Sequence, residues 1–342
     1  MKKVLKIIGL VLLSFFVVGF ILLKILGNRP AAPTDYQQTV QTGGAIEKKY
    51  MENGPYEVSM YESTVLQEFG KFLVYYPTVL ETGSEKYPVI VMCNGSGTPL
   101  SKYPAVARHL ASWGFIVIGT EENYSWNAFG AEMCLRYLER LDSMEEAHSM
   151  EEEHFMEEAQ SAEEARSSKE EHSNKKTDDK AYLFYQKVDF DNVGVVGHSQ
   201  GGVGVMNAIT DTAHKDFYKA AVSLSPTNKE LAHSLFWDYD ASLIEIAILL
   251  ISGEGGGDDW VVTGEQLRDI YDDIPSAKLM MRRRNTAHNE VLYSANGYVT
   301  AWFLWLLQGD EYAAGAFTGE HPEIWSNSLY QDLNQDLNQD LP

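Results

Sequence analysis

The feature that most constrains the fold is a regular alternation of short apolar runs and amphipathic segments from about Tyr56 onward. Short apolar runs bounded by turn residues are typical of buried strands, and the segments between them have helical periodicity. Parallel strands need crossover helices, which cover both faces of the sheet. The sequence therefore predicts an α/β fold with a mostly parallel central sheet and helices on both faces. We predict strands over 71–77, 87–95, 115–120, 192–196, 220–226, 246–253 and 277–283, and helices over 101–114, 128–142, 200–209, 264–275 and 290–309.

The first 27 residues form a separate unit. Lys2, Lys3 and Lys6 precede a stretch without charges from Ile7 to Leu23, which is about as long as the shortest membrane-spanning helices. We expect residues 1–27 to be an uncleaved transmembrane signal anchor, because the apolar core of a signal peptide is usually shorter and no clear cleavage site follows. The basic end stays in the cytoplasm, so the rest would be extracytoplasmic on a single-pass cell-membrane anchor. Cleavage of the segment and secretion is the alternative.

Three further segments lack the strand–helix alternation. Residues 28–55 are expected to be a polar linker to a domain over 56–313, and 314–342 a tail whose QDLN repeat is disordered. Residues 143–180 hold 13 acidic and 5 basic residues in an imperfect six-residue repeat that matches no helix face. We interpret this insertion as a solvated spacer. A lid is one alternative, and a weak cation-binding segment that uses His148, His154 and His172 is another.

The net charge and the cysteine content limit the partners and cofactors that the protein is expected to bind. The formal net charge of −22 disfavours binding to nucleic-acid phosphates or to anionic lipid through the overall field, so we expect no nucleic-acid partner. The two cysteines, Cys93 and Cys134, have no metal-ligand spacing and give no disulfide framework. We expect two free, buried thiols, and neither a metal nor an organic cofactor.

The most specific motif is Gly197-His198-Ser199-Gln200-Gly201, which follows the apolar run 192–196 and precedes a helix rich in small residues. A serine between glycines in a tight strand-to-helix turn matches the G-x-S-x-G nucleophile elbow. Glycine is required there because only glycine tolerates close backbone approach and positive φ. The pattern predicts Ser199 as a nucleophile, and an ordinary glycine-rich turn is the alternative.

A nucleophilic serine needs a base, and the base needs an acid that holds its tautomer. Asp258 and Asp259 follow the strand 246–253, and His288 follows the strand 277–283. The order serine, acid, histidine is that of α/β-hydrolases. The carboxyl ends of parallel strands meet at one edge of a sheet, so we expect Ser199, one aspartate and His288 to lie there together.

An oxyanion that forms on the substrate also needs hydrogen-bond donors. The residue after the nucleophile supplies one backbone N–H, which here belongs to Gln200. The loop after the strand 87–95 is expected to supply the second from Ser96, with Gly97 as the alternative. An ordinary strand-to-helix turn would use the same loop residues, and the two interpretations are compatible.

From about Tyr56 to Gly309 the chain resembles the α/β-hydrolases that group poly(ethylene terephthalate) hydrolases and bacterial cutinases with chlorophyllases, dienelactone hydrolases and platelet-activating-factor acetylhydrolases. The stretches that carry the resemblance are PVIVMCNGSG, HLASWGFIVIG, VDFDNVGVVGHSQGGVGV, LLISGEGGGDDWVV and AHNEV. It implies Ser199 as nucleophile, His288 as base, Asp258 as acid, and Ser96 and Gln200 as the oxyanion hole. Asp258 is preferred to Asp259 because the family acid precedes a short apolar pair that leads into a helix.

The resemblance has limits. Polyester hydrolases carry an aromatic residue in the oxyanion loop, where this chain has Ser96 and Gly97. We therefore expect a membrane-anchored serine hydrolase for small-molecule or lipid-like carboxylic esters rather than a polyester hydrolase. An acyltransferase on the same triad is one alternative, because an alcohol or amine can replace water in the second step. A non-catalytic surface binding protein is another, although the intact series Ser199, Asp258 and His288 argues against it.

Overall fold

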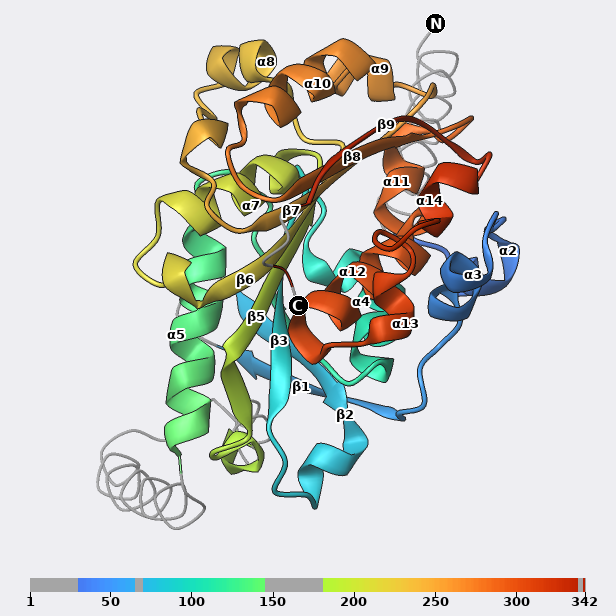
Figure 1. Cartoon of the computed structure of the whole chain (residues 1–342). Helices are drawn as coiled ribbons and strands as arrows, with labels where there is room; N and C mark the ends of the chain where they lie inside the picture. The colour runs from blue at the N-terminus through green and yellow to red at the C-terminus, as the bar shows by residue number, and fades with distance from the viewer. Residues whose placement is uncertain (1–29, 65–69, 145–180, 338–340, 342) are drawn as a thin grey trace, which may run out of the picture.

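The computed structural model describes residues 30–64, 70–144, 181–337 and 341. In this part of the chain a nine-stranded sheet runs in the order β1-β2-β4-β3-β5-β6-β7-β8-β9 (Figure 1). The strands from β4 to β8 in this order pair in parallel. The pairings of β1 with β2, of β2 with β4 and of β9 with β8 are antiparallel. The predicted mostly parallel sheet is confirmed. The strands are β1 (Val58–Thr64), β2 (Lys71–Pro77), β3 (Tyr87–Cys93), β4 (Ile116–Thr120), β5 (Val188–His198), β6 (Tyr218–Leu224), β7 (Ala247–Gly253), β8 (Lys278–Arg283) and β9 (Tyr330–Asp336).

Helices cover both faces of this sheet (Figure 1). Successive side chains of a strand point to opposite faces, so Val195 and Val196 of β5 belong to two different hydrophobic clusters. The cluster of Val196 includes α4 and α12, and that of Val195 includes α5, α7 and α10. The result is a three-layer α/β fold. The helices are α2 (Tyr36–Thr39), α3 (Ala45–Met51), α4 (Pro104–Ser112), α5 (Phe129–Ser143), α7 (Gln200–Thr210), α8 (Lys229–Ser234), α9 (Asp258–Val261), α10 (Gly264–Asp273), α11 (His288–Ser294), α12 (Asn296–Gln308), α13 (Glu311–Ala314) and α14 (Glu323–Ser326).

The predicted closing helix over 290–309 is two helices, α11 and α12, which are separated at Ala295. Helix α12 is buried on nearly all sides, and Trp302 and Phe303 in it are fully buried. Helices that are apolar all round lie in the interior. Helix α3, which precedes the first strand in the chain, and α13, which follows α12, both pack against it.

The predicted linker over 28–55 is wrong for the described residues from 30 on, because these residues are folded onto the domain. Helix α3 carries Glu47, whose side chain is fully buried and lies 2.9 Å from the guanidinium of Arg283 on β8. The Tyr330 hydroxyl and the Asn327 side-chain amide also donate to Glu47, at 2.7 and 2.8 Å. A buried carboxylate needs such partners, since an isolated buried charge is very costly. The sequence gives no hint of them, because they lie more than 200 residues further along the chain.

The predicted disordered tail over 314–342 is likewise wrong for most of its described residues. Its first QDLN repeats form β9, which pairs with β8 from Lys278↔Asp336 to Arg283↔Tyr330. The unpaired edge of β8 offers backbone donors and acceptors that a polar strand can satisfy. Composition alone therefore misjudged this segment.

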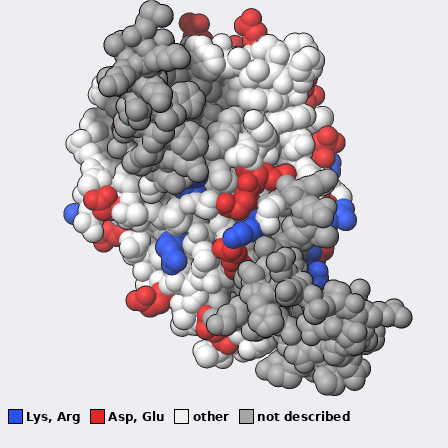
Figure 2. All heavy atoms as spheres, turned by 180° about the vertical axis from the view of Figure 1, so that it is seen from behind, with Lys and Arg blue, Asp and Glu red and all other residues white. Residues whose placement is uncertain are grey.

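Two predictions fall outside the described residues: the anchor over 1–27 and, except for residues 143 and 144, the acidic insertion. Among the residues that the structure does describe, no helix has the length and apolar character needed to span a membrane. The insertion carries much of the acidic excess, with 13 acidic against 5 basic residues. On the described part of the rear face, side chains of both signs are interspersed (Figure 2).

The predicted free, buried thiols of Cys93 and Cys134 are confirmed.

A buried polar contact joins the N-terminal segment to the helices of one layer. The Tyr36 hydroxyl lies 2.6 Å from His109 Nδ1 on α4 and accepts a hydrogen bond from Asn296 Nδ2 on α12 at 2.5 Å. His109 is fully buried, and this burial lowers its pKa to about 4. The neutral imidazole is thus the form that fits the folded protein.

We predict that His109 makes stability depend on pH. In the unfolded chain the histidine has a pKa of about 6.5, whereas in the folded protein its pKa is about 4. Between these two pH values the unfolded state binds a proton that the folded state does not. The free energy of unfolding therefore falls as the pH drops from about 6.5 to about 4. The loss amounts to about 3 kcal/mol at most. Urea unfolding of wild type and His109→Gln at pH 7, 5.5 and 4.5 measures it. The wild type should lose more stability toward acid than the variant, and equal losses would contradict the prediction.

Candidate active site

The turn at Ser199 depends on very close backbone approach between three elements. A Cβ on Gly201 of α7 would lie 2.2 Å from the carbonyl oxygen of Cys93 on β3, and one on Gly197 of β5 would lie 2.2 Å from the carbonyl oxygen of Gly201. Real Cβ atoms do not come this close to another heavy atom. Both glycines of the G-x-S-x-G motif are therefore required by packing, as the sequence predicts.

Ser199 lies between β5 and α7 with φ 59° and ψ −122°, a backbone conformation that costs free energy for any residue with a Cβ. Its amide donates to the Leu224 carbonyl at 2.8 Å, and its carbonyl accepts from the Gly202 amide at 2.9 Å. These two bonds hold the strained turn. The conformation presents a half-buried serine at the carboxyl edge of the sheet, as expected for a nucleophile elbow.

His288 and Asp258 meet at the same edge of the sheet. His288 Nδ1 lies 2.6 Å from Asp258 Oδ1, and Asp258 Oδ2 accepts a hydrogen bond from the Gly253 amide at the end of β7. Asp258 is fully buried, whereas 16% of the His288 side chain is exposed. A fully buried carboxylate with a backbone donor on one oxygen and an imidazole on the other is suited to hold that ring in one orientation. Ser199 Oγ and His288 make no hydrogen bond in the described structure, and apo sites often tighten this contact only with substrate.

Asp259 points elsewhere. Its carboxylate lies 2.7 Å from the guanidinium of Arg282, and 57% of its side chain is exposed. Arg282 Nε also donates to the Gly253 carbonyl at 3.1 Å, and its Nη1 lies 3.5 Å from Asp332 of β9. The sequence analysis preferred Asp258 and kept Asp259 as the alternative. In the structure Asp258 contacts His288, and Asp259 pairs with Arg282.

The loop after β3 is held in place by the loop after β4. The buried Asn94 side chain donates to the carbonyls of Thr120 and Glu122, both at 2.9 Å, and the Gly97 amide donates to the Asn123 carbonyl at 2.9 Å. The Gly97 amide is therefore engaged. The amides of Ser96 and Gln200 have no hydrogen-bond partner in the described part of the chain, which leaves them available to an oxyanion.

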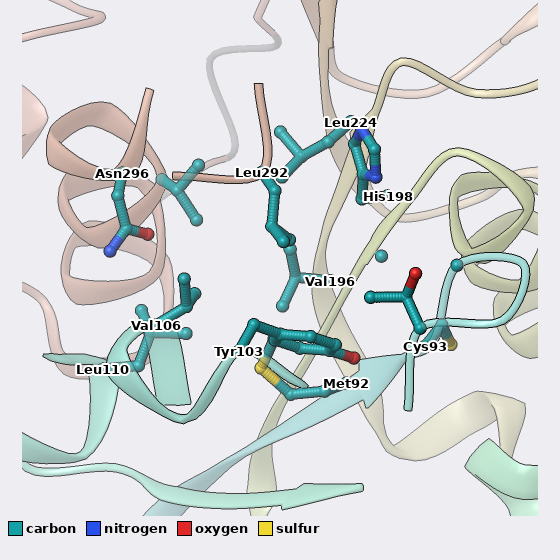
Figure 3. Close-up of a pocket in the computed structure, with 14 residues that line it drawn as sticks. Met92, Cys93, Tyr103, Val106, Leu110, Val196, His198, Leu224, Leu292 and Asn296 are labelled. Carbon is teal, nitrogen blue, oxygen red and sulfur yellow. The ribbon is translucent and has the colours of Figure 1, made fainter. Parts of the chain in front are cut away.

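Sequence reasoning missed one residue beside this site. His198, which precedes Ser199, is 8% exposed and lies at one end of a small apolar cavity with Leu224 and Leu292 (Figure 3). The available signal was a histidine directly after the buried apolar run 193–197 of β5. No group of three or more histidine, cysteine or acidic side chains in the described residues is arranged to bind a metal ion.

Comparison with known proteins agrees with the fold. Residues 71–226 match the sequence model of the family described as platelet-activating factor acetylhydrolase, isoform II. A search of curated proteins found no match. The family match and the sheet together support an ester hydrolase with an α/β-hydrolase fold. The matched segment contains Ser96, Ser199 and Gln200, and the match gives no support for the narrower group of polyester hydrolases and cutinases.

We predict that Asp258→Asn lowers ester turnover by about 10³–10⁴, because an amide neither stabilises an imidazolium nor favours the same tautomer. Asp259→Asn is the matched control. Its kcat should stay within about fivefold of wild type, since the Asp259 side chain is largely exposed and Arg282 keeps its contacts with Gly253 and Asp332. Kinetics on a nitrophenyl ester, with thermal unfolding as a check on folding, measures both. A large loss in Asp259→Asn with none in Asp258→Asn would reverse the assignment.

Proposed function

We propose that the protein is a membrane-anchored, extracytoplasmic serine hydrolase that cleaves small-molecule or lipid-like carboxylic esters through an acyl-enzyme. Ser199 is the nucleophile, His288 the general base and Asp258 the acid, and the amides of Ser96 and Gln200 form the oxyanion hole. The observation that carries the proposal is the 2.6 Å contact between His288 and the buried Asp258, at the same sheet edge as the strained Ser199 turn.

In the first half-reaction, the Ser199 hydroxyl oxygen attacks the ester carbonyl carbon while His288 takes the hydroxyl proton. The tetrahedral oxyanion is stabilised by the two free amides, each typically worth about 3 kcal/mol. The C–O bond to the alcohol then breaks, and His288 returns the proton to the leaving alcohol. In the second half-reaction, water replaces Ser199 by the same steps and releases the carboxylic acid.

Asp258 contributes through charge and orientation. Its carboxylate stabilises the imidazolium that His288 becomes in each step, and it fixes Nδ1 as the protonated nitrogen of the neutral ring. Nε2 of His288 is then the basic nitrogen. Because Asp258 is fully buried and already accepts the Gly253 amide, it is held in place before substrate binds.

We predict that Ser199→Ala abolishes ester hydrolysis, with a loss in kcat of at least about 10⁴. The change removes one hydroxyl at a half-exposed turn, so the protein should remain folded. Ser234→Ala on the exposed α8 is the matched control. The measurement is hydrolysis of nitrophenyl esters from acetate to octanoate, together with labelling by a fluorophosphonate. A folded Ser199→Ala with turnover within a few-fold of wild type, or still labelled, would refute the assignment.

The membrane part of the proposal rests on residues 1–27 of the sequence. We predict that the full chain stays with membranes after extraction with high salt, and that Phe15→Asp combined with Val18→Asp releases it, since a charge at the centre of a spanning helix costs about 3 kcal/mol. Fractionation and blotting measure the partition. A mature protein whose N-terminus begins beyond residue 26 would show a cleaved signal instead.

A further inference from the structure

His198 lies where two parts of the site come together. It is the last residue of β5 and the neighbour of Ser199 in the chain. Side-chain alternation places it on the same face of the sheet as Val196, the face covered by α4 and α12. Gly197 has no side chain and its position belongs to the other face. His198 is therefore the side chain that extends from the end of β5 toward α11 and α12.

The side chain reaches the backbone of His288. His198 Nε2 lies 2.8 Å from the carbonyl oxygen of His288, and the two imidazole rings are 4.6 Å apart with 41° between their planes. A carbonyl oxygen only accepts hydrogen bonds, so Nε2 of His198 must carry the proton. The acceptor is the first residue of α11, and the bond therefore ties the start of this helix to the end of β5.

The surroundings keep this donor uncharged. Val196, Leu224 and Leu292 line the cavity beside the ring (Figure 3), and burial lowers the pKa of His198 to about 3. Two titratable side chains face His288: Asp258 at the start of α9 and the neutral His198 of β5. Glu290 of α11 accepts a hydrogen bond from the Ala287 amide at 2.9 Å. A neutral neighbour adds no repulsion when His288 becomes an imidazolium.

We propose that His198 is a positioning residue that sets the place of His288 relative to Ser199. Asp258 fixes the rotation of the His288 ring, and His198 fixes the backbone from which that ring projects. Because His198 is joined directly to Ser199, a single side chain links the nucleophile and the base. This inference rests on the proposed function, since it assigns a role within the same site.

A pair of substitutions of nearly equal length tests the hydrogen bond. His198→Gln offers an amide N–H close to the place of Nε2, and His198→Met fills similar space without a donor. A misplaced catalytic group can cost about 100-fold in rate. We expect His198→Met to lose about 10- to 100-fold in kcat with KM little changed, and His198→Gln to recover most of it, while both unfold at similar temperatures.

The outcomes separate this role from the function itself. Equal kcat values in the Met and Gln variants, whether both high or both low, would overturn the role of the hydrogen bond. If His198→Met does not fold, His198→Asn, whose amide is too short to reach, replaces it in the comparison with His198→Gln. A wild type that neither hydrolyses the ester series nor reacts with a fluorophosphonate would overturn the proposed function, and the role of His198 with it.

Discussion

The contact between β3, β5 and α7 is the constraint on which the site depends. Helix α7 begins directly after the serine and runs back along the sheet, so its first turn must pass the end of β3 closely. Side chains at Gly197 or Gly201 would each meet a backbone carbonyl at 2.2 Å. The positive φ of Ser199 follows from the same requirement. Packing of three backbones therefore determines where the nucleophile stands, before any chemistry is considered.

Much of this could be predicted from the sequence, because it depends on local pattern. The apolar runs gave the parallel strands, and their order along the chain placed Ser199, Asp258 and His288 at one edge of the sheet. The choice between Asp258 and Asp259 could not be made from pattern alone. It depends on which carboxylate the turn after β7 directs to the Gly253 amide and which it directs to Arg282.

The incorrect predictions concern segments whose structure depends on contacts between residues distant in sequence. The segment around Glu47 is polar in composition, and only the partners Arg283, Asn327 and Tyr330 explain its burial. Strand β9 has few apolar residues and exists because β8 presents an open edge. The role of His198 could not be predicted, because the G-x-S-x-G motif allows any residue at its position. Its hydrogen bond is to a residue 90 positions away in the chain.

The repeated sequence of β9 makes two registers of this strand against β8 nearly equivalent. The run from residue 331 repeats QDLN, so sliding the chain by four positions returns the same side chains to the same face and the same neighbours. Tyr330 breaks this equivalence, because the residue four positions later is Asn334. The tyrosine is buried and holds Glu47 and Arg283, both at 2.7 Å. The Tyr330 side chain thus distinguishes the observed register from one shifted by four residues. It thereby also determines that Asp332 lies beside Arg282.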